Sequence, residues 1–211
     1  MNIKNVTILI LIITTFFTIK LNAQSNLKVT TNADDLEIGL TLFKPLTQDY
    51  KLTLFSLNEA GYSYDNNKTE FMTYNIISYD VYKGIAPTIG TRFIKQEFVD
   101  KAVLLGGLGY TYAKEKFFMT TVFTSEFQNN PDYEFFITSQ YRPKLTEKLI
   151  GYFEFESSMN FNSQSHLFSF QKFRLGVDFK KLQAGFSLDN YQYGKNWEYE
   201  FKPGVFVQLT L

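Results

Sequence analysis

The chain has 211 residues, with 21 acidic and 21 basic side chains and no cysteine. The lack of cysteine excludes a disulfide framework and a lipid-modified cysteine, and the balanced charge argues against a nucleic-acid partner. Aromatic residues make up 18% of the chain, with 23 Phe and 14 Tyr, a high share for an ordinary globular domain.

The first 23 residues have the pattern of a secretory signal peptide. MNIKN is a short basic start, an apolar run follows to Ile19, and Leu21-Asn22-Ala23 offers a small-residue cleavage site. A retained membrane anchor would need about 20 predominantly apolar residues, and Lys20 interrupts the run before that length. We therefore expect residues 1–23 to be cleaved and residues 24–211 to form a single β-barrel domain.

The rest of the chain alternates between apolar and polar positions, which is the period of a β-strand. A short segment at Asn26–Thr31 and eleven longer ones follow one another, and no convincing helical periodicity interrupts them. The pattern predicts an all-β, antiparallel up-and-down transmembrane barrel of about 12 strands, with 10 strands as the alternative. The residues assigned to the apolar, lipid-facing side are, in chain order, Leu36, Ile38, Leu40 and Leu42; Leu52 and Leu54; Met72, Tyr74 and Ile76; Ile85, Pro87, Ile89 and Phe93; Leu104, Leu108, Tyr110 and Tyr112; Phe117, Met119, Phe123 and Phe127; Tyr133, Phe135, Ile137 and Tyr141; Leu149, Phe153 and Phe155; Leu167, Phe173, Leu175, Val177 and Phe179; Leu182, Ala184, Phe186 and Leu188; and the odd positions from Trp197 to Leu211.

The connections between these segments are expected to differ at the two ends of the barrel. Short links such as Phe179-Lys180 and Arg142–Thr146 fall at one end. Longer polar links such as Tyr62–Lys68 fall at the other. Short turns at one rim and longer loops at the other are typical of transmembrane up-and-down barrels.

At its C-terminus the chain resembles the outer-membrane β-barrel proteins of Gram-negative bacteria. The last strand contains a polar residue, a glycine two positions later and two alternating hydrophobic residues, namely Lys202, Gly204, Val207 and Leu209. The resemblance implies that this segment is an assembly signal read by the barrel-assembly machinery, and that outer-membrane lipids surround the folded protein. Leu211 stands where the class usually has an aromatic residue.

A soluble periplasmic β-sandwich or a lipocalin-like binding protein would also alternate, with the apolar face inward. Strand length favours the membrane, since about 9 to 11 residues of tilted strand cross the hydrocarbon. Amphipathic rings favour it too, because such rings prefer the membrane interface. The expected aromatic girdle consists of Tyr110 and Tyr112 at one rim and Trp197 and Tyr199 at the other.

The polar faces of the last strands predict a charged cluster in the lumen. Its expected members are Glu154, Lys172, Arg174, Ser187, Asp189, Glu200 and Lys202. If the last hairpins turn where the pattern suggests, Lys172, Ser187 and Lys202 lie nearly in a row, with Asp189 and Glu200 one step further along. Such a cluster is either an internal salt-bridge network that fills the barrel or a charged constriction that selects solutes.

The predicted function is a porin-like, non-enzymatic protein of the cell outer membrane, exported through its signal peptide. It would act as a narrow channel or as a structural or surface-interaction element, with a small solute or surface partner that the sequence does not identify. An enzyme acting on outer-membrane lipids is an alternative, because His166 lies close in sequence to Ser163, Ser165 and Ser169. No motif supports a triad there, so we predict no catalytic residue, no cofactor and no metal site.

Overall fold

The computed structural model describes residues 24–65, 68–95 and 100–211, so the predicted signal peptide lies outside the described residues. Within this part of the chain no helix is long and apolar enough to cross a membrane. Twelve antiparallel strands form a single closed barrel in which each strand pairs with its neighbours in sequence and β1 pairs with β12. The strands are β1 Gln24–Asn32, β2 Asp35–Pro45, β3 Leu52–Ser63, β4 Thr69–Tyr79, β5 Ile85–Lys95, β6 Asp100–Lys114, β7 Phe117–Glu126, β8 Tyr133–Tyr141, β9 Ile150–Phe161, β10 His166–Phe179, β11 Leu182–Tyr193 and β12 Glu198–Thr210.

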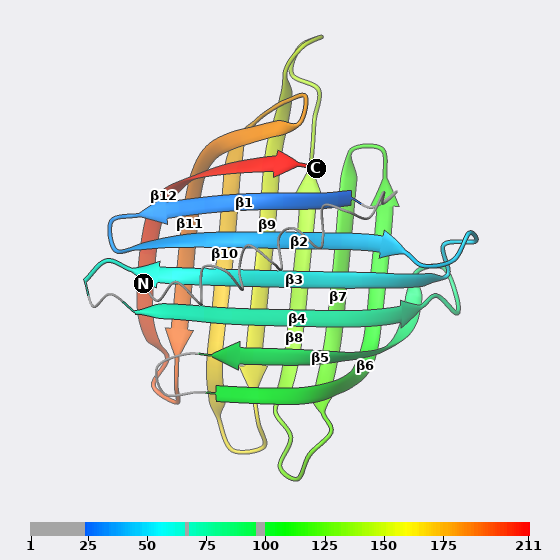
Figure 1. Ribbon diagram of the computed structural model, residues 1–211, viewed down its shortest axis with the longest axis vertical. Helices are drawn as coiled ribbons and strands as arrows, with labels where there is room; N and C mark the ends of the chain where they lie inside the picture. Colours follow the sequence, from blue (N-terminus) through cyan, green and yellow to red (C-terminus); the bar gives the residue numbers. More distant parts are fainter. Residues whose placement is uncertain (1–23, 66–67, 96–99) are drawn as a thin grey trace, which may run out of the picture.

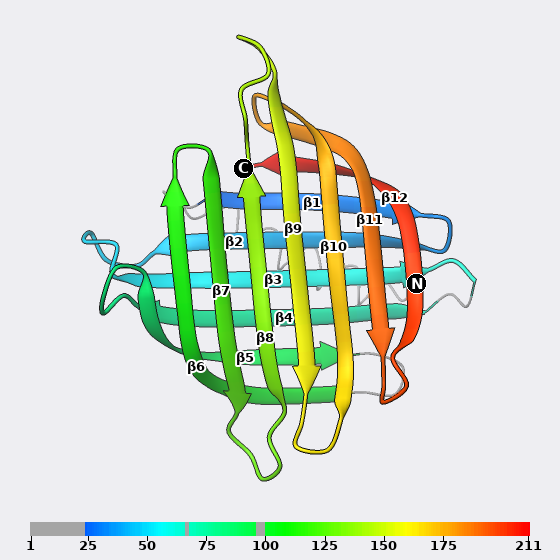
Figure 2. The same cartoon turned by 180° about the vertical axis from the view of Figure 1, so that it is seen from behind.

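The barrel is flattened, with β1–β5 on one side and β7–β11 on the other, and the strands of the two sides cross (Figures 1 and 2). The strands β6 and β12 bend from one side to the other. The beginning of β1 and the end of β12 lie at the same rim, where the Leu211 amide donates a hydrogen bond to the Ser25 carbonyl at 2.9 Å. We call this the termini rim and the other the opposite rim. Closure leaves no exposed sheet edge, which a β-structure in hydrocarbon requires because every backbone group must be paired.

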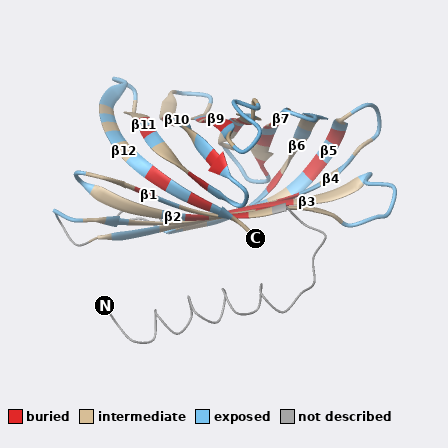
Figure 3. Cartoon of the chain, turned by 90° about the horizontal axis from the view of Figure 1, so that it is seen from above, coloured by how far each residue is buried: buried red, intermediate tan, exposed pale blue. Residues whose placement is uncertain are grey.

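The outer surface of the barrel is apolar and its lumen is rich in charged side chains, so the apolar side of the sheet faces outward. On the outer wall Phe186 and Leu108 expose 70% and 61% of their surface, whereas inside the barrel Lys172 and Arg174 expose only 4% and 2%. Figure 3 shows buried positions recurring along strands such as β5 and β12. A barrel that encloses its charges and exposes its Phe and Leu side chains is built for lipid, and the soluble alternative is thereby excluded.

One strand has the reverse of the predicted orientation. In β4 the apolar Met72, Tyr74 and Ile76 point into the barrel, because Tyr74 pairs with the inward Leu57 of β3. The lipid-facing set of β4 is Phe71, Thr73, Asn75, Ile77 and Tyr79. The prediction was wrong here because it equated the more apolar face with lipid, and this barrel keeps an apolar cluster inside.

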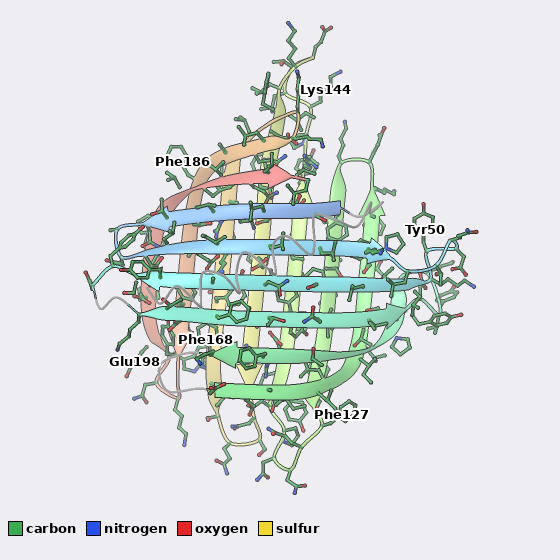
Figure 4. The ribbon with its side chains drawn as sticks, viewed as in Figure 1. Tyr50, Phe127, Lys144, Phe168, Phe186 and Glu198 are labelled. Atoms are coloured by element: carbon green, nitrogen blue, oxygen red, sulfur yellow. The ribbon has the colours of Figure 1, made fainter. Side chains whose placement is uncertain are left out.

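The predicted difference in connection length between the rims is also wrong. The longest connection, 142–149, lies on the termini rim, which was expected to carry only short turns. Figure 4 shows Lys144 on this connection, which extends well beyond the strands. The opposite rim includes the two-residue link 33–34. Loop length therefore does not indicate which rim faces the cell exterior.

The register of the last two hairpins differs from the prediction by two residues. The β10–β11 turn consists of Lys180 and Lys181, and the β11–β12 turn spans 194–197, so each is centred about one residue later than expected. As a result Lys172 pairs with Asp189, which pairs with Lys202, while Ser187 pairs with Arg174 and Gly204. A shift of two keeps every side chain on its predicted face, so the lumen has the expected residues in different pairs.

Candidate functional site in the barrel lumen

An apolar cluster occupies the middle of the lumen. Tyr74 and Phe55 of one side pack against Phe136 of the other, with ring centroids 6.2 and 6.0 Å from it. The buried members of the cluster are Phe55, Leu57, Tyr74, Ile76, Leu105, Phe136 and Phe170. Because the Phe55, Tyr74 and Phe136 rings come from opposite sides of the flattened barrel, they bridge it and narrow the lumen between the rims.

Lys172 on β10 connects the two sides of the barrel beside this cluster. Its ammonium donates to both carboxylate oxygens of Glu37 on β2, at 2.9 and 2.8 Å, and lies 3.4 Å from a carboxylate oxygen of Glu59 on β3. The same ammonium lies 5.0 Å from the centre of the Phe170 ring. The polar face of β10 predicted Lys172 in the lumen, but Glu37 and Glu59 were not predicted as its partners, because partners across a barrel are distant in sequence.

Two further ion pairs lie next to Lys172. Arg174 pairs with Asp189 of the neighbouring strand, and Lys28 of β1 crosses the lumen to pair with Glu154 of β9. Glu154 also accepts hydrogen bonds from the Tyr152 hydroxyl at 2.5 Å and from the Gln140 amide at 2.9 Å. The carboxylate of Glu154 is therefore fully satisfied, as a buried charge requires.

A second charged group lies nearer the opposite rim, and Arg92 of β5 is its centre. The guanidinium donates to Glu126 at 2.6 Å, to Glu134 at 2.9 Å and to the Asn160 amide oxygen at 2.9 Å. Lys101 lies 2.7 Å from Glu126, so this acid is held by two cations. Only the closed sheet shows that these residues, which come from β5, β6, β7, β8 and β9, form one network.

The remaining members of the predicted lumen cluster are dispersed. Lys202 of β12 donates to Asp35 of β2 at 2.6 Å and lies 3.2 Å from Glu200. Glu200 in turn accepts from the Tyr193 hydroxyl at 3.2 Å. Ser187 is buried, and its hydroxyl has no hydrogen-bond partner among the described residues. The predicted seven residues thus belong to neighbouring groups and not to one cluster.

A small free space lies between these side chains. A cavity of about 40 Å³ lies on the termini-rim side of the apolar cluster. Charged and polar side chains line most of it, and Phe43, Phe55 and Phe118 supply the apolar part. No group of three or more His, Cys, Asp or Glu side chains in the described ranges is arranged to hold a metal ion.

The predicted girdle residues lie on the outer wall near the rims. Tyr110 and Tyr112 are close to the β6–β7 turn at the termini rim, and Tyr199 is 68% exposed beside the opposite rim. Trp197 stacks on His166 with ring centroids 3.8 Å apart and an interplanar angle of 9°. These positions are compatible with a girdle, whose role in the membrane stays a prediction.

The predicted assembly-signal residues all lie on β12, the strand that closes the barrel. Val207 and Leu209 point outward and pair with Val29 and Leu27 of β1. Lys202 and Gly204 point inward, and a Cβ on Gly204 would collide with the Thr31 carbonyl oxygen. Recognition of this strand by an assembly machinery is not tested by its geometry.

Two solved porin structures share this architecture. One described as the KdgM porin has a TM-score of 0.54 at 9% sequence identity, covering 89% of this chain and 99% of its own. The NanC porin has a TM-score of 0.56 at 7% identity, covering 90% of this chain and 98% of its own. The chain has the fold of an outer-membrane β-barrel.

Other comparisons add little to this assignment. A structure of LpxR from Salmonella typhimurium has a lower TM-score of 0.48, at 8% identity over 89% of this chain and 100% of that one. No protein-family model matches the sequence, and no curated protein is similar to it. Because identities below 10% establish the fold alone, any specificity must be argued from the lumen of this chain.

Proposed function

We propose that this protein is a narrow outer-membrane channel, constricted at mid-height by the apolar cluster. The observation that supports this function most is a lumen lined by buried charges of both signs that keeps a free cavity of about 40 Å³. Such a lumen has room for water and small ions, whereas a sugar-sized solute would require side chains to move. Charged groups along a narrow path are a common means of ion selection.

The charges argue against a purely structural barrel. A buried ion pair can often be replaced by apolar packing of similar volume without loss of stability. This barrel nevertheless keeps Lys28, Arg92 and Lys172 paired across its lumen.

The same proposal includes export through the signal peptide, insertion by the assembly machinery through β12, and residence in the outer membrane.

Planar-bilayer recording of the purified protein tests the channel. Phe136→Ala removes the ring that contacts Phe55 and Tyr74, so it should widen the constriction and raise the single-channel conductance above that of wild type. Phe123→Ala is the matched control, because Phe123 lies on the outer wall at 43% exposure and its loss leaves the lumen unchanged.

The folded state of each variant is checked by heat-modifiable migration in a detergent gel. Folded barrels that stay silent in both wild type and Phe136→Ala would exclude a channel and leave the structural role. Equal conductance increases in Phe136→Ala and Phe123→Ala would show that the apolar cluster does not limit the passage.

A lipid hydrolase is the second candidate, and one contact favours it. His166 Nδ1 lies 2.9 Å from the Gly194 carbonyl oxygen, which can only accept a hydrogen bond, so Nδ1 carries the proton. Nε2 is then free to accept from the Ser169 hydroxyl 2.6 Å away, which is the arrangement of a general base and a nucleophile. Against it, Ser169 is fully buried, and no carboxylate in the described part of the chain is hydrogen-bonded to the histidine.

Lipid hydrolysis by wild type, Ser169→Ala and His166→Ala in detergent micelles decides between the two. The channel proposal expects no difference among the three proteins, because the pair then serves only to anchor the strand at its bulge. Hydrolysis by wild type that both substitutions abolish would make the protein an enzyme.

A further inference from the structure

Among the described residues, Glu156 on β9 is a buried acid with no hydrogen-bond or ion-pair partner. Its side chain points into the lumen, and the residue is only 8% exposed. Within the described part of the chain its carboxylate takes part in no hydrogen bond and no ion pair, in contrast to Glu154 two residues earlier. A buried carboxylate in that state is costly unless a proton or a cation joins it.

The nearby cations are already engaged. Lys172 is the direct cross-strand neighbour of Glu156, yet its ammonium reaches across the lumen to Glu37 and Glu59. Lys28 pairs with Glu154. This part of the lumen holds three basic side chains against five acidic ones, namely Lys28, Lys172 and Arg174 against Glu37, Glu59, Glu154, Glu156 and Asp189.

Glu156 also borders the free cavity of about 40 Å³. A cavity needs roughly 10–15 Å³ to hold one water molecule. This cavity therefore has room for a few water molecules or for ions of similar size. Other oxygen-bearing side chains line it, including Thr41 and Thr138, and so does Lys28, whose ammonium is paired with Glu154. Thr138 is the cross-strand neighbour of Glu156 on β8. Oxygen ligands suit hard cations.

We propose that this cavity is a binding site for a small monovalent cation such as K⁺, with Glu156 as its charged ligand and Thr41 and Thr138 as neutral oxygen ligands. The site lies on the termini-rim side of the constriction, in the passage that an ion would take. Its use in selecting cations over anions rests on the proposed channel function, whereas the binding itself does not.

Thermal unfolding of the folded protein tests the binding directly. The midpoint is measured in KCl and in N-methyl-D-glucamine chloride at equal ionic strength, because the organic cation is too large for the cavity. A ligand that binds only the folded state raises the midpoint. Wild type should unfold at a higher temperature in KCl, and Glu156→Gln should lose this difference. The control Glu147→Gln removes a charge from the exposed 142–149 connection and should keep it.

The result that overturns the site is an equal midpoint in both salts for wild type, or a K⁺ effect that survives in Glu156→Gln. The first outcome would mean that K⁺ does not bind preferentially to the folded barrel. Reversal potentials in a KCl gradient then test selection: wild type should favour K⁺, and Glu156→Gln should shift the potential toward zero. Absence of any conductance would refute the channel, while K⁺ stabilisation would still stand.

Discussion

At the scale of single residues, the lumen is held together by long cationic side chains that cross it. Lys172, Lys28 and Arg92 each pair with acids on strands that are far apart in sequence. The Lys172 ammonium also lies 5.0 Å from the centre of the Phe170 ring in the apolar cluster. Removing one of them leaves acids buried without a counter-charge.

Lys172→Met should therefore destabilise the barrel. Glu37 and Glu59 lose their shared cation, and leaving a buried charge unpaired costs about 3 kcal/mol. This value is the lower end of the range for buried pairs, and we expect it because the Glu37 side chain keeps 20% exposure. The free energy of unfolding is measured by denaturant titration in lipid vesicles. Lys148→Met is the control, because Lys148 is exposed on the termini rim, and it should leave stability unchanged. Similar losses from both substitutions would show that the cross-lumen pairs are not important for stability.

At the scale of elements, β4 shows that apolar character alone does not identify the lipid-facing side. Its inward residues Tyr74 and Ile76 are 3% and 1% exposed, and its outward face includes Thr73 and Asn75, which are hydrogen-bonded to each other at 2.7 Å. The pairing of β4 with β3 and β5 determines the orientation, because a strand in a sheet must share the faces of its neighbours.

Site-directed spin labelling checks this orientation. The chain has no native cysteine, so Ile77→Cys and Ile76→Cys each provide a single labelling site. A nitroxide at position 77, where the native side chain is 43% exposed, should collide frequently with lipid-dissolved oxygen, and one at position 76 should be shielded. The reverse order of oxygen accessibility would restore the orientation predicted from the sequence pattern.

At the scale of the whole molecule, the outer wall determines where the protein can reside. A band of exposed Phe, Leu, Ile and Val side chains surrounds the barrel. In water such a surface would aggregate, whereas in a bilayer it is solvated by acyl chains. The effect of a charge on this wall should therefore depend on its depth in the membrane.

Val205→Arg places a charge near the middle of β12 on the outer wall and should lower the free energy of unfolding in vesicles by about 2–4 kcal/mol. The same substitution at Leu211, at the termini rim, should cost about 0–1 kcal/mol. The two native side chains have comparable exposure, at 48% and 39%, so the pair isolates depth. Equal and negligible effects at both positions would indicate a barrel in water.

Several residues of the candidate site could be predicted from the sequence, but their pairs could not. The β10–β11 turn is the reason, because Lys180 takes a left-handed conformation with φ +62° that is usually taken by glycine or asparagine. The segment Phe-Lys-Lys-Leu contains no such residue, so nothing in the local sequence locates the turn. A turn placed one residue too early pairs Lys172 with Ser187. In the structure Lys172 pairs with Asp189.

The sequence by itself determined the strands, their number and nearly all of their faces, because a side chain's alternation between two faces is a local property of an extended backbone. Only the tertiary structure decided that the apolar side faces outward, that β4 contributes to an apolar cluster in the lumen, and that Glu156 has no ion-pair partner among the described residues. Those features depend on contacts across a closed barrel, between residues such as Lys172 and Glu37 that are 135 positions apart in the chain.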